Sequence, residues 1–207
     1  MEKQNLNQTC NTQVFWGEMS PCDHVLQIYK TDDAFLDVLE EFTLSGIASN
    51  ECVIIIGTVN HLKALEDRML LRGLDVDALN DDEQFIPLNA EIALGKFMRN
   101  NKPDERLFSH FVMGLMDKAN RKKRKVRAFG EMVAILWAEG HNEATVQLEN
   151  LWTNFCNTEA FCLFCAYPEN GFTQDITSSI KTICQAHTKV IDRWNKSETE
   201  VVYKSAS

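Results

Sequence analysis

Residues 52–69 read CVIIIGTVNHLKALEDRM, and this stretch decides the fold. Residues 53–56 are four consecutive β-branched apolar residues, a pattern typical of a strand that is buried on both faces of a parallel sheet. Gly57 ends this run, and apolar side chains then recur at helical spacing. A strand, a glycine turn and a helix in this order are the frame on which a phosphate-binding loop is built.

The loop lacks most of the residues that bind a nucleotide. A working loop has the form GxxxxGK[ST]: the second glycine lets the backbone wrap the phosphates, the lysine neutralises their charge and the hydroxyl binds Mg²⁺. Here TVNHLKA follows Gly57, so the second glycine is missing and Lys63 precedes Ala64 rather than Ser or Thr. We therefore expect hydrolysis of MgATP to be lost, although the N–H groups at the start of the helix can still attract an anion.

The bulk composition is that of an ordinary globular protein. The chain has 207 residues, 44% hydrophobic and 25% charged, and a formal net charge of −9. This length suits one α/β domain, and the negative charge argues against direct nucleic-acid binding. We expect neither a membrane-spanning helix nor a secretory signal, because the apolar runs are short and the first residues are polar. Seven cysteines, an odd number, indicate reduced thiols and a cytoplasmic location.

Apolar strand patterns alternate with amphipathic helical patterns, which predicts a three-layer α/β fold: a mostly parallel sheet flanked by helices. We expect a polar N-terminal lead-in over residues 1–22, one α/β domain over residues 23–190, and a polar, frayed tail over residues 191–207. The expected strands are residues 24–29, 53–56, 84–88, 125–129 and 160–167.

Some residues allow more specific expectations. Pro87 lacks an N–H, which places its strand at an edge of the sheet or near a strand end. Gly46 is expected to end the helix that Thr31 or Asp32 begins. A last helix is expected over residues 175–187. The stretch VFWGEM, residues 14–19, is apolar enough to dock on a surface.

Glu131 is the first candidate for a functional side chain. It follows the strand 125–129 and Gly130, so it is expected at the carboxyl edge of the sheet, where open α/β sheets bind ligands. The alternative is a structural role in which its carboxylate complements the dipole at the start of its own helix. The sequence leaves both roles open.

Arg127 and Glu149 form a candidate structural ion pair. Arg127 lies on the strand that leads to Glu131, and a guanidinium inside a layered fold needs a carboxylate. Glu149 lies in the otherwise apolar helical stretch VQLENLW and needs a partner in turn. We expect these two residues to pair, with Glu131 as the second choice for Arg127.

The remaining polar motifs favour structural interpretations. Cys162 and Cys165 have CxxC spacing, but on a strand they point to opposite faces and cannot readily bridge or share a metal. The histidines at positions 24, 61, 110, 141 and 187 lack metal-ligand spacing, so we expect no metal and no cofactor. The basic run RKKRK, residues 121–125, is a solvated turn or, alternatively, a docking patch for an acidic partner.

Several segments together resemble the MEDS domain, the methanogen/methylotroph sensory domain. They span about residues 23–172, and the block RAFGEMVAILW…G…A…LENLW is the most specific part. In chain order they are DHVLQIY, ECVIIIGTVNHLKALEDRMLLRGLDVDAL, FIPLNAEIALGKFM, KVRAFGEMVAILWAEGHNEATVQLENLW and FCLFCAYP.

This resemblance implies a RecA/KaiC-like fold with a decayed phosphate loop, which agrees with the residues missing after Gly57. Family members often precede histidine-kinase or helix-turn-helix modules in prokaryotes, and the family is proposed to sense small organic molecules such as hydrocarbon derivatives. Too few residues follow CAYP for a kinase, so we expect a stand-alone domain that signals to a separate histidine kinase or transcription regulator.

The function expected from these observations is non-catalytic sensing of a small ligand or partner protein at the carboxyl edge of the sheet. One alternative is a residual nucleotide-binding protein or ATPase, with Glu131 positioning water or metal. Another is an oligomeric scaffold, since RecA-like domains often self-associate. The candidate ligand-binding residues all lie at expected strand ends: Gly57, Thr58, His61, Asn89, Glu131 and Tyr167.

Overall fold

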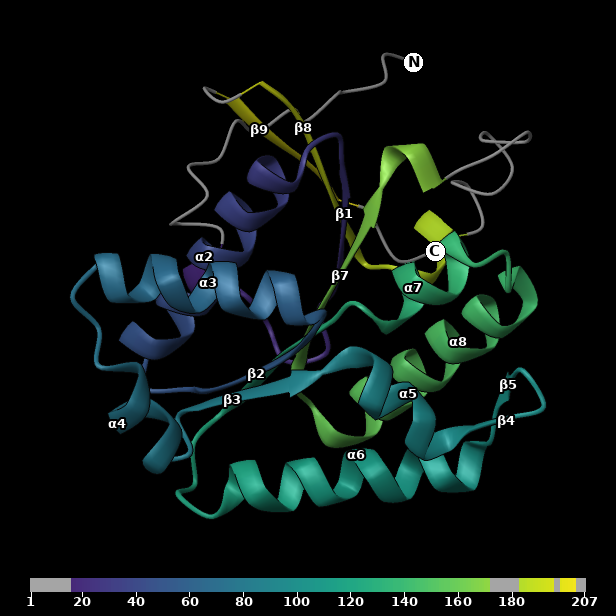
Figure 1. Ribbon diagram of the computed structural model, residues 1–207, viewed down its shortest axis with the longest axis horizontal. Helices are drawn as coiled ribbons and strands as arrows, with labels where there is room; N and C mark the ends of the chain where they lie inside the picture. The colour runs from purple at the N-terminus through teal and green to yellow at the C-terminus, as the bar shows by residue number, and fades with distance from the viewer. Residues whose placement is uncertain (1–15, 172–182, 196–197, 204–207) are drawn as a thin grey trace, which may run out of the picture.

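The computed structural model describes residues 16–171, 183–195 and 198–203 (Figure 1). Its main sheet has the strand order β3-β2-β6-β7-β1-β8-β9. Neighbouring strands from β3 to β8 are parallel, and β9 is antiparallel to β8. The strands are β1 (His24–Tyr29), β2 (Cys52–Gly57), β3 (Phe85–Asn89), β6 (Val126–Gly130), β7 (Cys162–Pro168), β8 (Lys189–Asn195) and β9 (Glu198–Tyr203). A separate antiparallel hairpin joins β4 (Met98–Arg99) to β5 (Lys102–Pro103).

Helices cover both faces of this sheet, as Figure 1 shows. One face carries α2 (Asp32–Ala48), α3 (Val59–Leu71) and α4 (Val76–Asp81). The other carries α5 (Ala90–Phe97), α6 (Glu105–Asn120), α7 (Met132–Ala138) and α8 (Asn142–Glu159), and a short turn of 3₁₀ helix, η1 (Glu169–Gly171), follows β7. The three-layer α/β prediction is therefore confirmed, and β3, which contains Pro87, is an edge strand.

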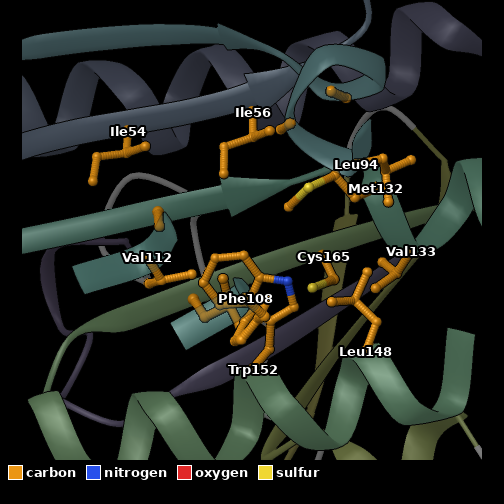
Figure 2. Packing of buried hydrophobic residues seen from close by; sticks show 14 of the residues in the cluster. Ile54, Ile56, Leu94, Phe108, Val112, Met132, Val133, Leu148, Trp152 and Cys165 are labelled. Atoms are coloured by element: carbon orange, nitrogen blue, oxygen red, sulfur yellow. The ribbon is translucent and has the colours of Figure 1, made fainter. Parts of the chain in front are cut away.

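The pleat of the sheet divides the apolar side chains between two cores. Ile54, Ile56 and Cys165 face α5 to α8 and belong to the core shown in Figure 2. Val53 and Ile55 face α2 and α3. Because successive residues of a strand point to opposite faces, the uninterrupted apolar run in β2 supplies both cores.

Gly46 does not end α2, which differs from the expectation. The helix continues to Ala48, and Ser49 is its C-cap. Gly46 lies where α2 approaches the sheet: a Cβ atom at this position would come within 2.6 Å of Val53 Cγ2 and 2.7 Å of Arg127 Cδ. The glycine is needed for close packing against β2 and β6.

Arg127 is buried on the same side of the sheet and pairs with Glu51, not with Glu149. Its Nε donates to the Glu51 carboxylate, Nη1 donates to the Phe42 carbonyl oxygen at 2.9 Å, and Nη2 donates to the Trp16 carbonyl oxygen at 3.3 Å. The predicted pair does not form because Arg127 points toward α2, whereas α8, which carries Glu149, covers the opposite face.

Both ends of the described chain pack on the domain. Trp16, from the stretch expected to dock, is fully buried, with ring centroids 4.9 Å from Phe42 and 5.2 Å from Phe164. At the other end, β8 and β9 occupy much of the region where a frayed tail was expected. The helix expected over residues 175–187 lies largely outside the described residues, of which 183–186 are helical.

Basic residues of the run 121–125 form ion pairs with acidic residues of the same chain. Arg121 lies 2.7 Å from Glu83, Lys122 lies 3.2 Å from Asp82, and Arg124 also binds Asp82. The charges of Arg121, Lys122 and Arg124 are thus matched by a neighbouring acidic turn, which supports the interpretation as a solvated turn.

We predict that Gly46→Ala destabilises the protein by about 1–3 kcal/mol, because the added methyl group overpacks the contact between α2 and the sheet. Gly114→Ala is the matched control: it also lies inside a helix, α6, but a Cβ there meets no atom within 4 Å. That substitution is expected to stabilise by about 0.5–1 kcal/mol. Urea unfolding of both variants measures the difference, and effects of the same sign would contradict the close-packing explanation.

Removing the guanidinium is expected to be more costly. Arg127→Ala leaves buried carbonyl groups without their donor and should destabilise by about 3–5 kcal/mol. Glu51→Gln keeps an acceptor oxygen but removes the negative charge beside the guanidinium, and should cost less, about 1.5–3 kcal/mol. Denaturant midpoints of the two variants test this order, and an Arg127→Ala midpoint equal to that of the wild type would show that the buried contacts do not form.

Candidate functional site

Two helix N-termini meet at the carboxyl edge of the sheet. β2 and β3 end in register, with Gly57 beside Asn89. Thr58 caps α3, its hydroxyl accepting the His61 N–H at 3.4 Å. Asn89 caps α5, its side-chain oxygen accepting a backbone N–H at 2.7 Å. Because helix N-termini carry partial positive charge, this edge favours negatively charged groups.

Glu131 supplies such a charge from the end of β6. Its Oε2 accepts the Thr58 N–H at 2.8 Å, and its Oε1 lies 2.7 Å from His61 Nδ1. The side chain is buried and makes no capping hydrogen bond to its own helix, α7. The sequence left open that the Glu131 carboxylate complements the dipole of its own helix, α7. It complements the dipole of α3 instead, because it lies at the start of that helix, where helices commonly bind anions.

His61 is the other half of this arrangement. Burial acts to lower the pKa of His61, but the hydrogen bond and charge of Glu131 outweigh it, so the pKa is raised above its usual value. The ring of His61 also meets Phe35 edge-on at 4.8 Å, and Phe35 stacks on Tyr29 at 4.9 Å. Burial, and then the charge of Glu131, raise the pKa of Tyr29, which keeps its phenol neutral.

An open hollow of about 520 Å³ lies outside this pair. The imidazole of His61 forms part of its wall with 16% of the side chain exposed, so a bound molecule can reach it. The lining mixes apolar side chains with carboxylates, which suits a neutral or cationic ligand better than a phosphate. It comprises Asp32, Leu36, Thr58, Val59, Asn60, His61, Ala64 and Glu91.

The structure brings together most of the residues that the sequence nominated. Gly57, Thr58, His61 and Glu131 lie in one group, and a Cβ atom on Gly57 would come within 3.4 Å of Glu131 Oε2. Asn89 lies beside Gly57, but its side chain is used to cap α5.

Tyr167 lies apart from this group. It is fully buried on the other face of the sheet, where its hydroxyl donates to Glu149. Asp32 and Glu91 were missed as lining residues. Each is an acidic residue in the first turn of a helix, and each of these helices follows a strand that ends at this edge of the sheet. That sequence pattern could have identified both residues.

The raised pKa of His61 makes stability depend on pH in a defined direction. The stabilisation from the His61–Glu131 pair is complete below the unfolded-state pKa of about 6.5 and is lost as pH rises through the higher folded-state value. We predict that the stability gap between wild type and His61→Gln is largest near pH 6 and shrinks toward pH 9. Urea unfolding across this range measures it, with His110→Gln, an exposed position on α6, as control. A gap that widens with pH would contradict the assignment.

Two solved structures from Pyrococcus horikoshii OT3 have a similar fold. One, described as a structural study of project PH0250, has 12% sequence identity and a TM-score of 0.60, covering 95% of this chain and 93% of that chain. The other, the KaiC-like protein PH0186, has 11% identity and a TM-score of 0.57, covering 89% and 80%. At this identity the likeness concerns the fold alone, and it confirms the expected KaiC-like fold.

A search of curated proteins gave no match. Among the described residues, none of the helices has the length and apolar character needed to cross a membrane. The family model for the "MEthanogen/methylotroph, DcmR Sensory domain" matches residues 23–188. Since the match covers most of the chain and includes Glu131, His61 and the strands that position them, the chain belongs to the MEDS family of sensory domains.

Proposed function

We propose that this chain is a non-catalytic sensory domain that binds a small neutral or cationic organic molecule in the hollow beside His61. The observation that carries the proposal is the position of Glu131, whose carboxylate accepts the Thr58 N–H at the start of α3. The chain thereby supplies its own anion at the place where a nucleotide-binding relative needs free N–H groups for a phosphate.

The surroundings of the hollow also disfavour a nucleotide. Asp32 and Glu91 lie in the lining together with His61, which contacts Glu131, so a triphosphate would approach several carboxylates. The lysine and hydroxyl pair that would offset this charge is missing after Gly57. Lys63 is bonded instead to Asp67, one turn further along α3, at 3.1 Å.

Binding of a ligand at His61 can change the contacts of Glu131 and of helix α3. A molecule that hydrogen-bonds to the exposed side of His61 changes how this imidazole shares its proton with Glu131, and Glu131 in turn holds the first turn of α3. The proposal includes transfer of this change to a signalling partner of the histidine-kinase or transcription-regulator class.

Calorimetry with ATP and GTP, each with and without Mg²⁺, tests the non-catalytic part. We expect no Mg²⁺-dependent binding and no release of phosphate. Micromolar Mg²⁺-dependent binding, with turnover abolished by Glu131→Gln, would establish the alternative of a residual ATPase instead.

Native mass spectrometry of protein purified from its own host tests the sensing part. We expect a co-purified organic mass on the wild type that is reduced on His61→Gln. The matched control is Lys63→Gln, which changes the same helix outside the lining of the hollow. Equal retention of the mass by both variants would place the ligand elsewhere.

A further inference from the structure

Four side chains that can bind a metal meet inside the protein, on the face of the sheet opposite α2 and α3. They are His24 at the start of β1, Cys165 on β7, Glu149 on α8 and His187 just before β8. Figure 2 shows Cys165 in the layer between the sheet and α8. Each of the four is at most 3% exposed. None of them belongs to the hollow at the carboxyl edge.

Three separations between the ligand atoms are close to those around one tetrahedral ion, and the fourth, between Cys165 and Glu149, is longer. Glu149 Oε2 lies 3.4 Å from His24 Nε2 and 3.6 Å from His187 Nε2. Cys165 Sγ lies 3.4 Å from His24 Nε2 and 4.0 Å from Glu149 Oε2. Bond lengths of about 2.0–2.3 Å at a tetrahedral zinc imply ligand separations of about 3.3–3.6 Å. The nitrogen–oxygen separations here are also longer than ordinary hydrogen bonds of about 2.7–3.2 Å.

Hydrogen bonds at the Nδ1 atoms of His24 and His187 fix which ring nitrogen of each histidine carries the proton. His187 Nδ1 lies 2.8 Å from the Ile183 carbonyl oxygen, which can only accept, so Nδ1 carries the proton. His24 Nδ1 lies 3.1 Å from Thr153 Oγ1, whose own hydroxyl donates to the Ala186 carbonyl oxygen. Both Nε2 atoms therefore present lone pairs to the cluster. Such contacts typically fix metal-binding histidines.

The Nε2 lone pairs of His24 and His187 face an oxygen of the Glu149 carboxylate, and these electron-rich atoms are stabilised by a proton or a cation between them. Tyr167 donates to the other oxygen of Glu149, which leaves Oε2 directed at the two histidines. Within the described part of the chain, the buried Nε2 of His187 has no hydrogen-bond partner. A proton on Glu149 and the thiol proton of Cys165 could satisfy individual atoms, but neither would explain why all four ligand atoms converge within 4.8 Å of one another.

We propose that His24, Glu149, Cys165 and His187 bind one Zn²⁺ ion. Two imidazole nitrogens, a thiolate and a carboxylate form a donor set of intermediate softness, which suits zinc better than Mg²⁺ or Ca²⁺. The four protein ligands complete a tetrahedron, and their burial leaves no position for water, so the site is structural rather than catalytic.

The proposed zinc ion would connect four parts of the fold. Its ligands lie at the start of β1, in the middle of β7, on α8 and in the segment that leads into β8. Because metal binding to such a site contributes directly to folding free energy, zinc would fasten the β8–β9 hairpin to the rest of the sheet. This inference does not depend on the proposed ligand hollow.

The test is metal analysis of the full chain. Protein produced in zinc-supplemented medium and passed through a gel-filtration column is expected to retain about one zinc per chain by elemental mass spectrometry. Anaerobic exchange with Co²⁺ should give the visible bands of a tetrahedral ion and a sulfur-to-cobalt charge-transfer band. These wild-type measurements decide the matter even where a variant fails to fold.

Cys165→Ser and Cys162→Ser form a matched pair, because both cysteines lie buried on β7 but point to opposite faces. Cys165→Ser should abolish the charge-transfer band and weaken zinc binding by more than the roughly 10–100-fold that loss of an outer contact costs. Cys162→Ser should leave both unchanged. Wild-type protein that retains no zinc and shows no thiolate–cobalt band would overturn the proposal, as would equal losses in the two variants.

Discussion

The buried guanidinium of Arg127 is the constraint on which much of this structure depends. It is 2% exposed and must place its donors inside the fold, which it does on Glu51 and on the backbone carbonyls of Phe42 and Trp16. These acceptors come from the turn before β2, from α2 and from the N-terminal segment. One charge therefore fixes how closely α2 lies on the sheet, and the absence of a side chain at Gly46 makes that approach possible.

The same strand, β6, then delivers Glu131 to the carboxyl edge. Arg127 satisfies its charge beneath α2, whereas Glu131 satisfies its charge at the N-terminus of α3, with His61 as its second partner. The ion pairs of Arg68 with Asp37 and Glu40 connect α3 to α2. Gly57, Thr58, His61 and Glu131, the edge group, are thus held beside two connected helices, which is the support that the proposed ligand site needs.

The sequence predicts the layers and most of the edge group because both follow from local patterns. The apolar run in β2 requires two covered faces, and Gly57, Thr58 and Glu131 directly follow strand patterns, while His61 lies one helical turn beyond. The partner of Arg127 does not follow from such patterns, because they do not say which helix covers which face. The convergence of His24, Cys165, Glu149 and His187 depends on β1 lying between β7 and β8, which no residue spacing along the chain encodes.

The place of β1 in the sheet also has a consequence for how the chain acquires its fold during synthesis. Val25 pairs with Phe164 on one side and with Lys189 on the other, whereas β2 has both of its neighbours, β3 and β6, earlier in the chain than β7. As the ribosome releases the chain from its N-terminus, β1 emerges before the other described strands, whereas its neighbours β7 and β8 are made much later. Contacts so distant in sequence form slowly. Among the described strands, β1 is therefore made early but gains its neighbours in the sheet late, and its unpaired edges are open to chaperones until then.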